Sequence, residues 1–325
     1  MAGPLVEARD LRRTYRVRPP GLRGLFGGSE ERVALDGVDL DIHAGERVAL
    51  LGANGAGKST TVKLLCGLLA PTAGRLTVAG RVPHTRRAEH VRDLGVVFGH
   101  RTQLWWDLRV QDGLDVLARL HGVRDGGAQR AALVDALDAG PLLERRVREL
   151  SLGQRTRCEL VAALQHRPSL LLLDEPSVGL DVGARAALRR AVLAACEQTG
   201  ATVLLTSHDL GDVRAVCDRV LVLQEGRLVH DGSMREVVAR LGGQRRLRVR
   251  LAEPLEAPGR LRDALGPAVL IDGVMVELGF SGAAPERVSQ VSAAIEAAGG
   301  QVHDLVLSEP DLDAVLARLF EEEGA

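Results

Sequence analysis

The stretch that decides the fold runs from Arg47 to Thr60 and reads Arg-Val-Ala-Leu-Leu-Gly-Ala-Asn-Gly-Ala-Gly-Lys-Ser-Thr. Its first five residues have the apolar character of a buried strand, and a helix is expected to begin near Ser59. Between them lies G-x-x-x-x-G-K-[ST], which forms a phosphate-binding loop when it stands between a strand and a helix. The alternative is a glycine-rich turn with a surface lysine. The context favours a phosphate site.

The residue types in this loop suit phosphate chemistry. Glycines let backbone N–H groups wrap phosphate oxygens, and the helix start adds partial positive charge. Lys58 can reach the β and γ phosphates of a nucleotide, and the Ser59 hydroxyl is placed for Mg²⁺. The predicted binding residues are Gly52, Asn54, Gly55, Gly57, Lys58, Ser59 and Thr60, with Lys58 also assigned to catalysis.

Two other apolar strands end in polar side chains. Leu170–Leu173 is followed by Asp174 and Glu175, and buried strands do not end in adjacent acids without something to neutralise them. We expect Asp174 to contact Mg²⁺ through water and Glu175 to polarise an attacking water, with helix capping as the alternative. Ligands bind at the carboxyl ends of parallel strands, so His208 could contact a γ-phosphate, although such a histidine is more often structural.

The residues around this stretch predict an α/β fold. From Val33 to about Leu241 strands alternate with helices, as in a parallel sheet covered on both faces. Leu5–Val17 and Val38–Ile42 alternate like antiparallel strands, with Arg18–Glu31 as a loop, and residues 101–150 are mainly helical. The predicted parallel strands are Arg47–Leu51, Gly95–Phe98, Leu170–Leu173, Thr202–Thr206 and Val220–Gln224.

After Gly242-Gly243 the pattern changes to β-α-β-β-α-β with one more helix, Asp311–Glu322, which matches the ferredoxin-like unit. The sequence therefore predicts two domains. The first covers residues 1–242 with a helical subdomain at about 101–158, and residues 243–325 form a small α+β domain.

The composition of the chain argues against nucleic-acid binding and against membrane-spanning helices. The 325 residues carry 42 basic and 43 acidic side chains, and a net charge of −1 gives no electrostatic footprint for nucleic acid. All but two basic residues are arginine, and the exceptions are Lys58 and Lys63. No apolar run has the length of a transmembrane helix and the start has no signal-peptide core, so we expect a cytosolic chain.

Further motifs resemble those of the ATP-binding cassette (ABC) family. Leu150-Ser-Leu-Gly-Gln-Arg155 resembles its signature motif, and Ser177-Val-Gly-Leu-Asp181 resembles its D-loop. Tyr15 matches the aromatic residue that stacks on adenine, although a core tyrosine is the alternative. The resemblance implies a P-loop ATPase that uses ATP and Mg²⁺, with a RecA-like core, an antiparallel β subdomain and a helical subdomain.

The resemblance also implies a partner cassette. Two copies, or two paired cassettes, would sandwich ATP head to tail, and Asp181 would relay across the interface. The signature residues of one copy would contact the γ-phosphate held by Lys58 and Ser59 of the other. Those signature residues are Ser151, Gly153 and Gln154.

Within the family, the stretch from Val96 to Leu108, the signature spelling and the tail from Ser308 resemble cassettes of ABC-2-type exporters. This implies separately encoded transmembrane permease subunits and a peripheral position on the cytoplasmic face of the membrane. A non-transport cassette acting on nucleic acid or ribosomes is one alternative. A regulatory cassette with slow turnover is the other.

Two features depart from expectation. His100 stands where the family places a glutamine, and because imidazole is a poorer magnesium ligand we expect slower or more pH-sensitive hydrolysis. Trp105 and Trp106 follow it, and adjacent residues on an extended stretch cannot both face one core. One buried ring and one partly covered ring is the first interpretation, and a docking surface for a membrane subunit is the second.

Overall fold

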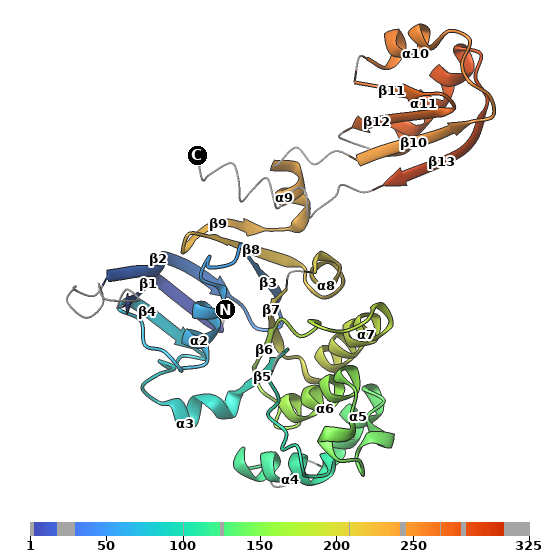
Figure 1. Ribbon diagram of the computed structural model, residues 1–325. Helices are drawn as coiled ribbons and strands as arrows, with labels where there is room; N and C mark the ends of the chain where they lie inside the picture. Colours follow the sequence, from blue (N-terminus) through green and yellow to red (C-terminus); the bar gives the residue numbers. More distant parts are fainter. Residues whose placement is uncertain are drawn as a thin grey trace, which may run out of the picture. The chain divides into compact units, whose positions relative to one another are not determined.

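The computed structural model describes residues 3–17, 30–99, 101–123, 127–207, 209–240, 245–266, 268–280 and 284–308. The chain forms two compact units, residues 1–234 and 235–325 (Figure 1). Among the described residues, no helix combines the length and apolar character needed to cross a bilayer.

The first unit is built on a central sheet with the strand order β5-β6-β7-β3-β8-β9. Its strands run parallel except β9, which is antiparallel to β8. Because both faces are covered, β6 is nearly all leucine and fully buried up to Asp174. The bounds are β3 (Arg47–Leu51), β5 (Leu94–Phe98), β6 (Leu170–Asp174), β7 (Thr202–Thr206), β8 (Arg219–Gln224) and β9 (Arg227–Gly232).

A smaller antiparallel sheet has the strand order β2-β1-β4, with β1 (Val6–Val17), β2 (Glu30–Ile42) and β4 (Ala73–Val78). Its buried face shares one hydrophobic cluster with the central sheet and with α2 (Lys58–Leu65). The prediction began the second strand at Val38, which is wrong. Cross-strand pairing with β1 starts at Glu30, where the sequence is polar because this end of the strand is exposed.

Helices cover the central sheet. A second cluster joins strand residues to α4 (Val110–Leu120), α5 (Gly127–Ala136), α6 (Leu152–Leu164) and α7 (Val182–Thr199). The short helices α3 (Arg87–His90) and α8 (Leu210–Val216) complete the unit. The prediction that residues 101–150 are mainly helical is therefore confirmed, since α4 and α5 lie within that range.

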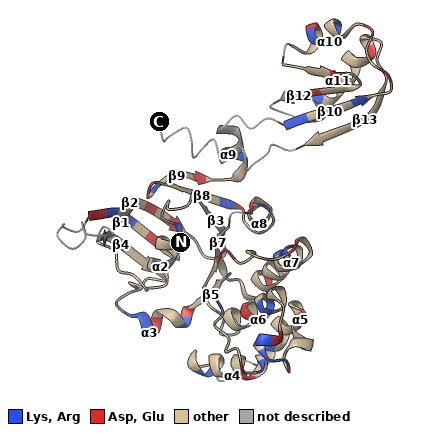
Figure 2. Ribbon diagram, viewed as in Figure 1, with Lys and Arg blue, Asp and Glu red and all other residues tan. Residues whose placement is uncertain are grey.

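Ion pairs link neighbouring strands of the first unit. Arg9 on β1 pairs with Asp41 on β2 at 2.7 Å, and Arg219 on β8 pairs with Asp231 on β9 at 2.6 Å. Figure 2 shows basic and acidic residues interspersed along the same elements. The arginines of these strands are thus partly neutralised within the chain.

The second unit contains β10 (Arg245–Leu251), α10 (Pro258–Leu265), β11 (Leu270–Asp272), β12 (Met275–Phe280), α11 (Ala284–Ala297) and β13 (Val302–Ser308). Its antiparallel sheet has the order β11-β12-β10-β13 and packs its own core against the two helices. This is the predicted ferredoxin-like order of elements. By its contacts the unit starts at Arg235, within α9 (Met234–Arg240), whereas Gly242-Gly243 and the predicted helix 311–322 lie outside the described residues.

Candidate nucleotide-binding site

The phosphate loop connects β3 to α2 as the sequence predicted. Gly57 immediately precedes α2 with φ of 113°, a conformation that side chains other than glycine rarely adopt, and a Cβ there would lie 2.7 Å from the carbonyl oxygen of Ala34. The start of α2 therefore approaches β2 closely. Its first turn presents Lys58, Ser59 and Thr60 to one cavity.

The Lys58 ammonium is held over this loop. Its Nζ donates hydrogen bonds to the carbonyl oxygens of Gly52 at 2.6 Å and Ala53 at 3.1 Å. Burial lowers the pKa of Lys58, and the nearby carboxylates of Glu175 and Asp174 oppose that fall. A partly desolvated ammonium facing two carboxylates is well placed to bind an anionic phosphate.

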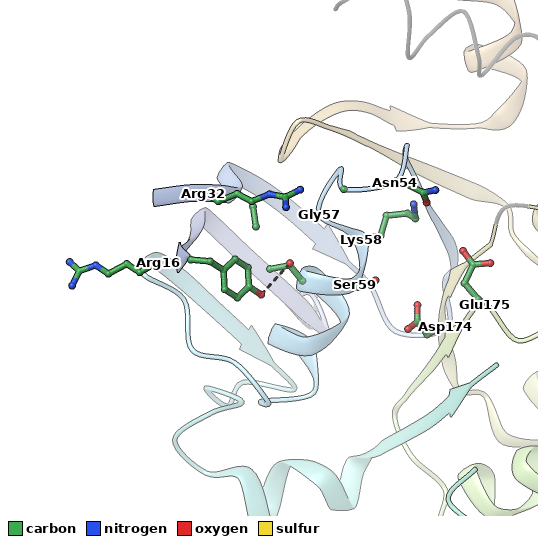
Figure 3. Close-up of a pocket in the computed structure, with 12 residues that line it drawn as sticks. Arg16, Arg32, Asn54, Gly57, Lys58, Ser59, Asp174 and Glu175 are labelled. Atoms are coloured by element: carbon green, nitrogen blue, oxygen red, sulfur yellow. Dashed lines mark hydrogen bonds between the residues drawn. The ribbon is translucent and has the colours of Figure 1, made fainter. Parts of the chain in front are cut away.

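The two acids at the end of β6, Asp174 and Glu175, point into the same cavity (Figure 3). The Thr206 hydroxyl at the end of β7 donates to Asp174 Oδ1 at 2.6 Å. Glu175 adopts φ of 52°, and its backbone N–H donates to the carbonyl oxygen of Thr206 at 3.0 Å. A non-glycine residue in this left-handed region costs about 1 kcal/mol or more, and such strain clusters at functional sites.

Tyr15 closes the other end of the cavity from β1. The Tyr15 hydroxyl lies 3.4 Å from the Thr60 hydroxyl, and the Arg13 guanidinium lies 4.9 Å from the centre of the ring. One face of the ring is therefore in contact with a cation. The tyrosine lines the cavity together with the phosphate loop, which places it outside the hydrophobic core.

The cavity has a volume of about 630 Å³. It brings together the predicted residues Tyr15, Asn54, Gly55, Gly57, Lys58, Ser59, Thr60, Asp174 and Glu175. Arg16 and Arg32 also line it and were not predicted. Arg32 lies directly opposite Tyr15 in the β1–β2 register. It was not predicted because the register of two strands cannot be determined from a single sequence.

The signature residues form the start of α6 and do not line this cavity. Ser151 caps the helix by accepting a hydrogen bond from the Gln154 N–H at 3.3 Å, and Gln154 Oε1 accepts one from the Ser151 N–H at 3.1 Å. Asp181 caps α7 by accepting from the Ala184 N–H at 2.8 Å. A Cβ on Gly153 would lie 3.2 Å from Ala184 Cβ, so the two helix starts are in close contact.

A buried polar network connects the D-loop with the residues on either side of position 208. Asp212 on α8 is 3% exposed and accepts hydrogen bonds from the hydroxyls of Ser177 and Ser207. Arg189 on α7 donates to Asp212 at 2.6 Å and to Asp209 at 3.1 Å. His208 itself and His100 lie outside the described residues, so their predicted roles stay predictions.

The two tryptophans do not follow the core interpretation. Trp105 is 44% exposed and Trp106 is 51% exposed, so neither ring is buried. The Arg155 guanidinium lies 5.2 Å from the centre of the Trp106 ring. Exposed neighbouring aromatic rings are consistent with the docking alternative.

The fold and the cavity define a P-loop nucleotide-binding protein. The profile of the family described as ABC transporter matches residues 35–178. The daunorubicin resistance ATP-binding protein DrrA3 of Streptomyces coeruleorubidus is 35% identical over 90% of this chain and 94% of its own length. The chain therefore belongs to the ABC transporter family, and it is an ATPase subunit of that family.

Other similar proteins include subunits of different transporters. The energy-coupling factor transporter ATP-binding protein EcfA1 of Symbiobacterium thermophilum is 36% identical over 81% of this chain and 91% of its own length. The structure of cbiO1 from Clostridium perfringens, part of the ABC transporter complex cbiONQ, is 26% identical. It superposes with a TM-score of 0.61 over 73% of this chain and 92% of its own.

Proposed function

We propose that this chain binds ATP with Mg²⁺ as one of two paired cassettes. Hydrolysis of that ATP would drive an exporter. The observation that carries the proposal is the cavity in which Lys58, Ser59 and the two acids at the end of β6 converge. The daunorubicin resistance relative supports export, and it agrees with the ABC-2-type features of the sequence. ATP hydrolysis by this chain would supply the free energy for transport through the permease.

The residues around Asp174 fit a magnesium ion. Mg²⁺ takes hard oxygen ligands and is commonly bound through one or two carboxylates together with substrate phosphates. Ser59 and Asp174 supply a hydroxyl and a carboxylate within the cavity, and Thr206 fixes one Asp174 oxygen. When bound, the ion would neutralise charge on the β and γ phosphates.

The protein side chains divide the remaining work. Lys58 would hold the β and γ phosphates, and Tyr15 would offer its open ring face to adenine. Glu175 would accept a hydrogen bond from the attacking water and polarise it, a role typically worth about 10²–10⁴ in rate. His208 would contact the γ-phosphate as the sequence predicts.

The position of the signature motif supports pairing of two cassettes. Ser151, Gly153 and Gln154 are displayed at the start of α6 and do not line the cavity that holds Lys58. A second cassette facing head to tail would bring its signature helix to the γ-phosphate, where the helix N-terminus favours negative charge. ATP would then hold the two cassettes together until hydrolysis removes the shared phosphate.

The Trp105–Trp106 surface is our proposed docking site for a separately encoded permease. Aromatic rings supply large buried area at protein interfaces, and these two are about half exposed. Docking there would place the chain as a peripheral subunit on the cytoplasmic face of the membrane. The rival function is a regulatory cassette with slow turnover. It is favoured by His100, which stands where the family places a glutamine.

The substitution Glu175→Gln tests the proposal. We expect ATP hydrolysis to fall about a hundred-fold or more while ATP binding is kept, because the amide cannot act as a base. Adding ATP with Mg²⁺ should then convert the variant to a dimer in size-exclusion chromatography. Glu197→Gln on the exposed face of α7 is the control and should hydrolyse ATP like the native chain.

Native turnover no faster than that of Glu175→Gln would favour the regulatory rival. A variant that binds ATP and stays monomeric would contradict the pairing of cassettes.

A further inference from the structure

A carboxylate is buried inside the signature helix. Glu159 lies on α6 among core residues and is 4% exposed. Burial raises the pKa of Glu159, and hydrogen bonds from residues 102–104 oppose that rise. A charged or polar side chain in such a place is costly unless its oxygens are satisfied.

Among the residues that the structure describes, the hydrogen-bond donors to this carboxylate all come from the loop that follows β5. The Gln103 N–H donates to Glu159 Oε1 at 3.1 Å, and the Leu104 N–H donates to the same oxygen at 3.4 Å. The Thr102 hydroxyl also donates to Oε1. In return, the Gln103 side-chain amide donates to the backbone oxygen of Glu159 at 3.3 Å.

The same loop continues along the residues before and within α6. The Arg148 N–H donates to the carbonyl oxygen of Trp106 at 3.1 Å, and the Val147 N–H donates to that of Leu108 at 3.1 Å. The Arg155 guanidinium lies over the Trp106 ring, four residues before Glu159 on the helix. Residues 102–108 are thus joined to residues 147–159 at both ends, and Ser151 lies within that second stretch.

Among these contacts, those of Glu159 are made by a buried side chain. Its acceptor oxygens face two backbone N–H groups, whose positions are fixed by the chain. Removing the carboxylate would leave the partly buried Gln103 N–H without its acceptor, whereas the Leu104 N–H would keep the Thr102 hydroxyl at 3.1 Å. The tryptophans, by contrast, are held mainly at the surface.

We propose that Glu159 is a positioning residue that locks the loop 102–108 to the signature helix, so that a displacement of Trp105 and Trp106 is transmitted to Ser151. The inference rests on the proposed function, in which Ser151 contacts the γ-phosphate of the partner cassette. Glu159 does not line the nucleotide cavity, and it acts through the position of α6. The exposed tryptophan surface and the signature serine therefore move as one body.

A double-mutant cycle on the full chain tests the lock. ATPase kcat and KM are measured with saturating Mg²⁺ for the native chain, Glu159→Ala, Trp106→Ala and the combined variant. Glu159→Ala should lower kcat several-fold and leave KM for ATP unchanged, because Glu159 does not line the cavity. The combined variant should lose no more than the more damaging single change, because both changes break the same connection.

Val161→Ala is the matched control. Val161 is fully buried on the same helix, and it takes part in none of the hydrogen bonds described above between α6 and the loop 102–108. When Val161→Ala is combined with Trp106→Ala, the effects of the two changes on ln kcat should be additive. Glu159→Gln keeps one acceptor oxygen and the size of the side chain, so it should lie between native and Glu159→Ala, and it serves as the test variant if Glu159→Ala does not fold.

A spectroscopic measurement supplies the second test. The chain has two tryptophans, both in this loop, so its tryptophan fluorescence reports on the loop directly. Acrylamide quenching should increase in Glu159→Ala and Glu159→Gln and stay native in Val161→Ala.

Three outcomes would each contradict the proposal. They are additive effects of Glu159→Ala and Trp106→Ala on kcat, a rise in KM for ATP that parallels the fall in kcat, and acrylamide quenching unchanged from the native chain. Absence of ATPase activity in the native chain would instead refute the proposed function.

Discussion

At the scale of single residues, the two lysines of this arginine-rich chain have different environments. Lys63 is exposed in the last turn of α2, where a cation suits the C-terminal end of the helix dipole. Lys58 is in the first turn of the same helix, and its Nζ donates hydrogen bonds to two carbonyl oxygens of the phosphate loop. The compact ammonium fits between those oxygens, whereas a planar guanidinium is larger and forked.

We therefore expect Lys58→Arg to lower kcat/KM for ATP by about a hundred-fold, the scale of losing one preorganised charge donor. Lys63→Arg keeps the charge on the same helix and should leave both kinetic constants unchanged. Steady-state ATPase assays with direct ATP-binding measurements check the pair. If Lys58→Arg bound and hydrolysed ATP normally, the assignment of the phosphate site would be wrong.

At the scale of elements, a stacked histidine pair connects the helical region to the central sheet. His121, just after α4, and His166, just after α6, have ring centroids 3.8 Å apart, and His166 Nε2 lies 3.1 Å from the carbonyl oxygen of Leu94 on β5. Burial, together with the neighbouring His121, lowers the pKa of His166 to about 4. His166 is thus kept neutral in the folded chain near pH 7.

This lowered pKa predicts acid-sensitive stability. The unfolded chain binds the His166 proton more tightly, so stability is full above the ordinary histidine pKa of about 6.5 and is lost as pH falls towards about 4. Between about pH 7 and pH 5.5 the native chain should lose about 1 kcal/mol more than His166→Gln, whose amide can still donate to Leu94.

Urea unfolding followed by tryptophan fluorescence measures the stability of the first unit at both pH values. His84→Gln, which removes an exposed imidazole, should keep the native pH dependence. Equal pH dependence in native and His166→Gln chains would show that this histidine is not the acid-sensitive group.

The elements also show what a single sequence can and cannot predict. The parallel strands matched their predicted positions closely, because they are apolar on both faces and end at glycine or polar residues. The early start of β2 was missed because its exposed end is polar, and Arg32 was missed with it. The contacts of Glu159 were also missed, since one acid in a helix usually faces solvent and only the tertiary fold shows that this one faces residues 102–104.

At the scale of the whole molecule, the separation of the signature motif from the cavity predicts complementation between two inactive chains. A chain with Lys58→Ala lacks the phosphate lysine. A chain with Ser151→Asp places a negative charge against the γ-phosphate of the partner cassette, while aspartate still caps α6. Each variant alone should be inactive.

A mixture of the two variants should recover activity, because a mixed dimer joins the native Lys58 of one chain to the native Ser151 of the other. Random pairing makes about half of the dimers mixed, each with one intact site of two, so the mixture should reach about a quarter of the native rate. Ser151→Asn, which caps the helix without the charge, is the control and should remain active alone. A mixture as inactive as its components would show that each site is built from a single chain. In that case a mixed dimer could not contain an intact site.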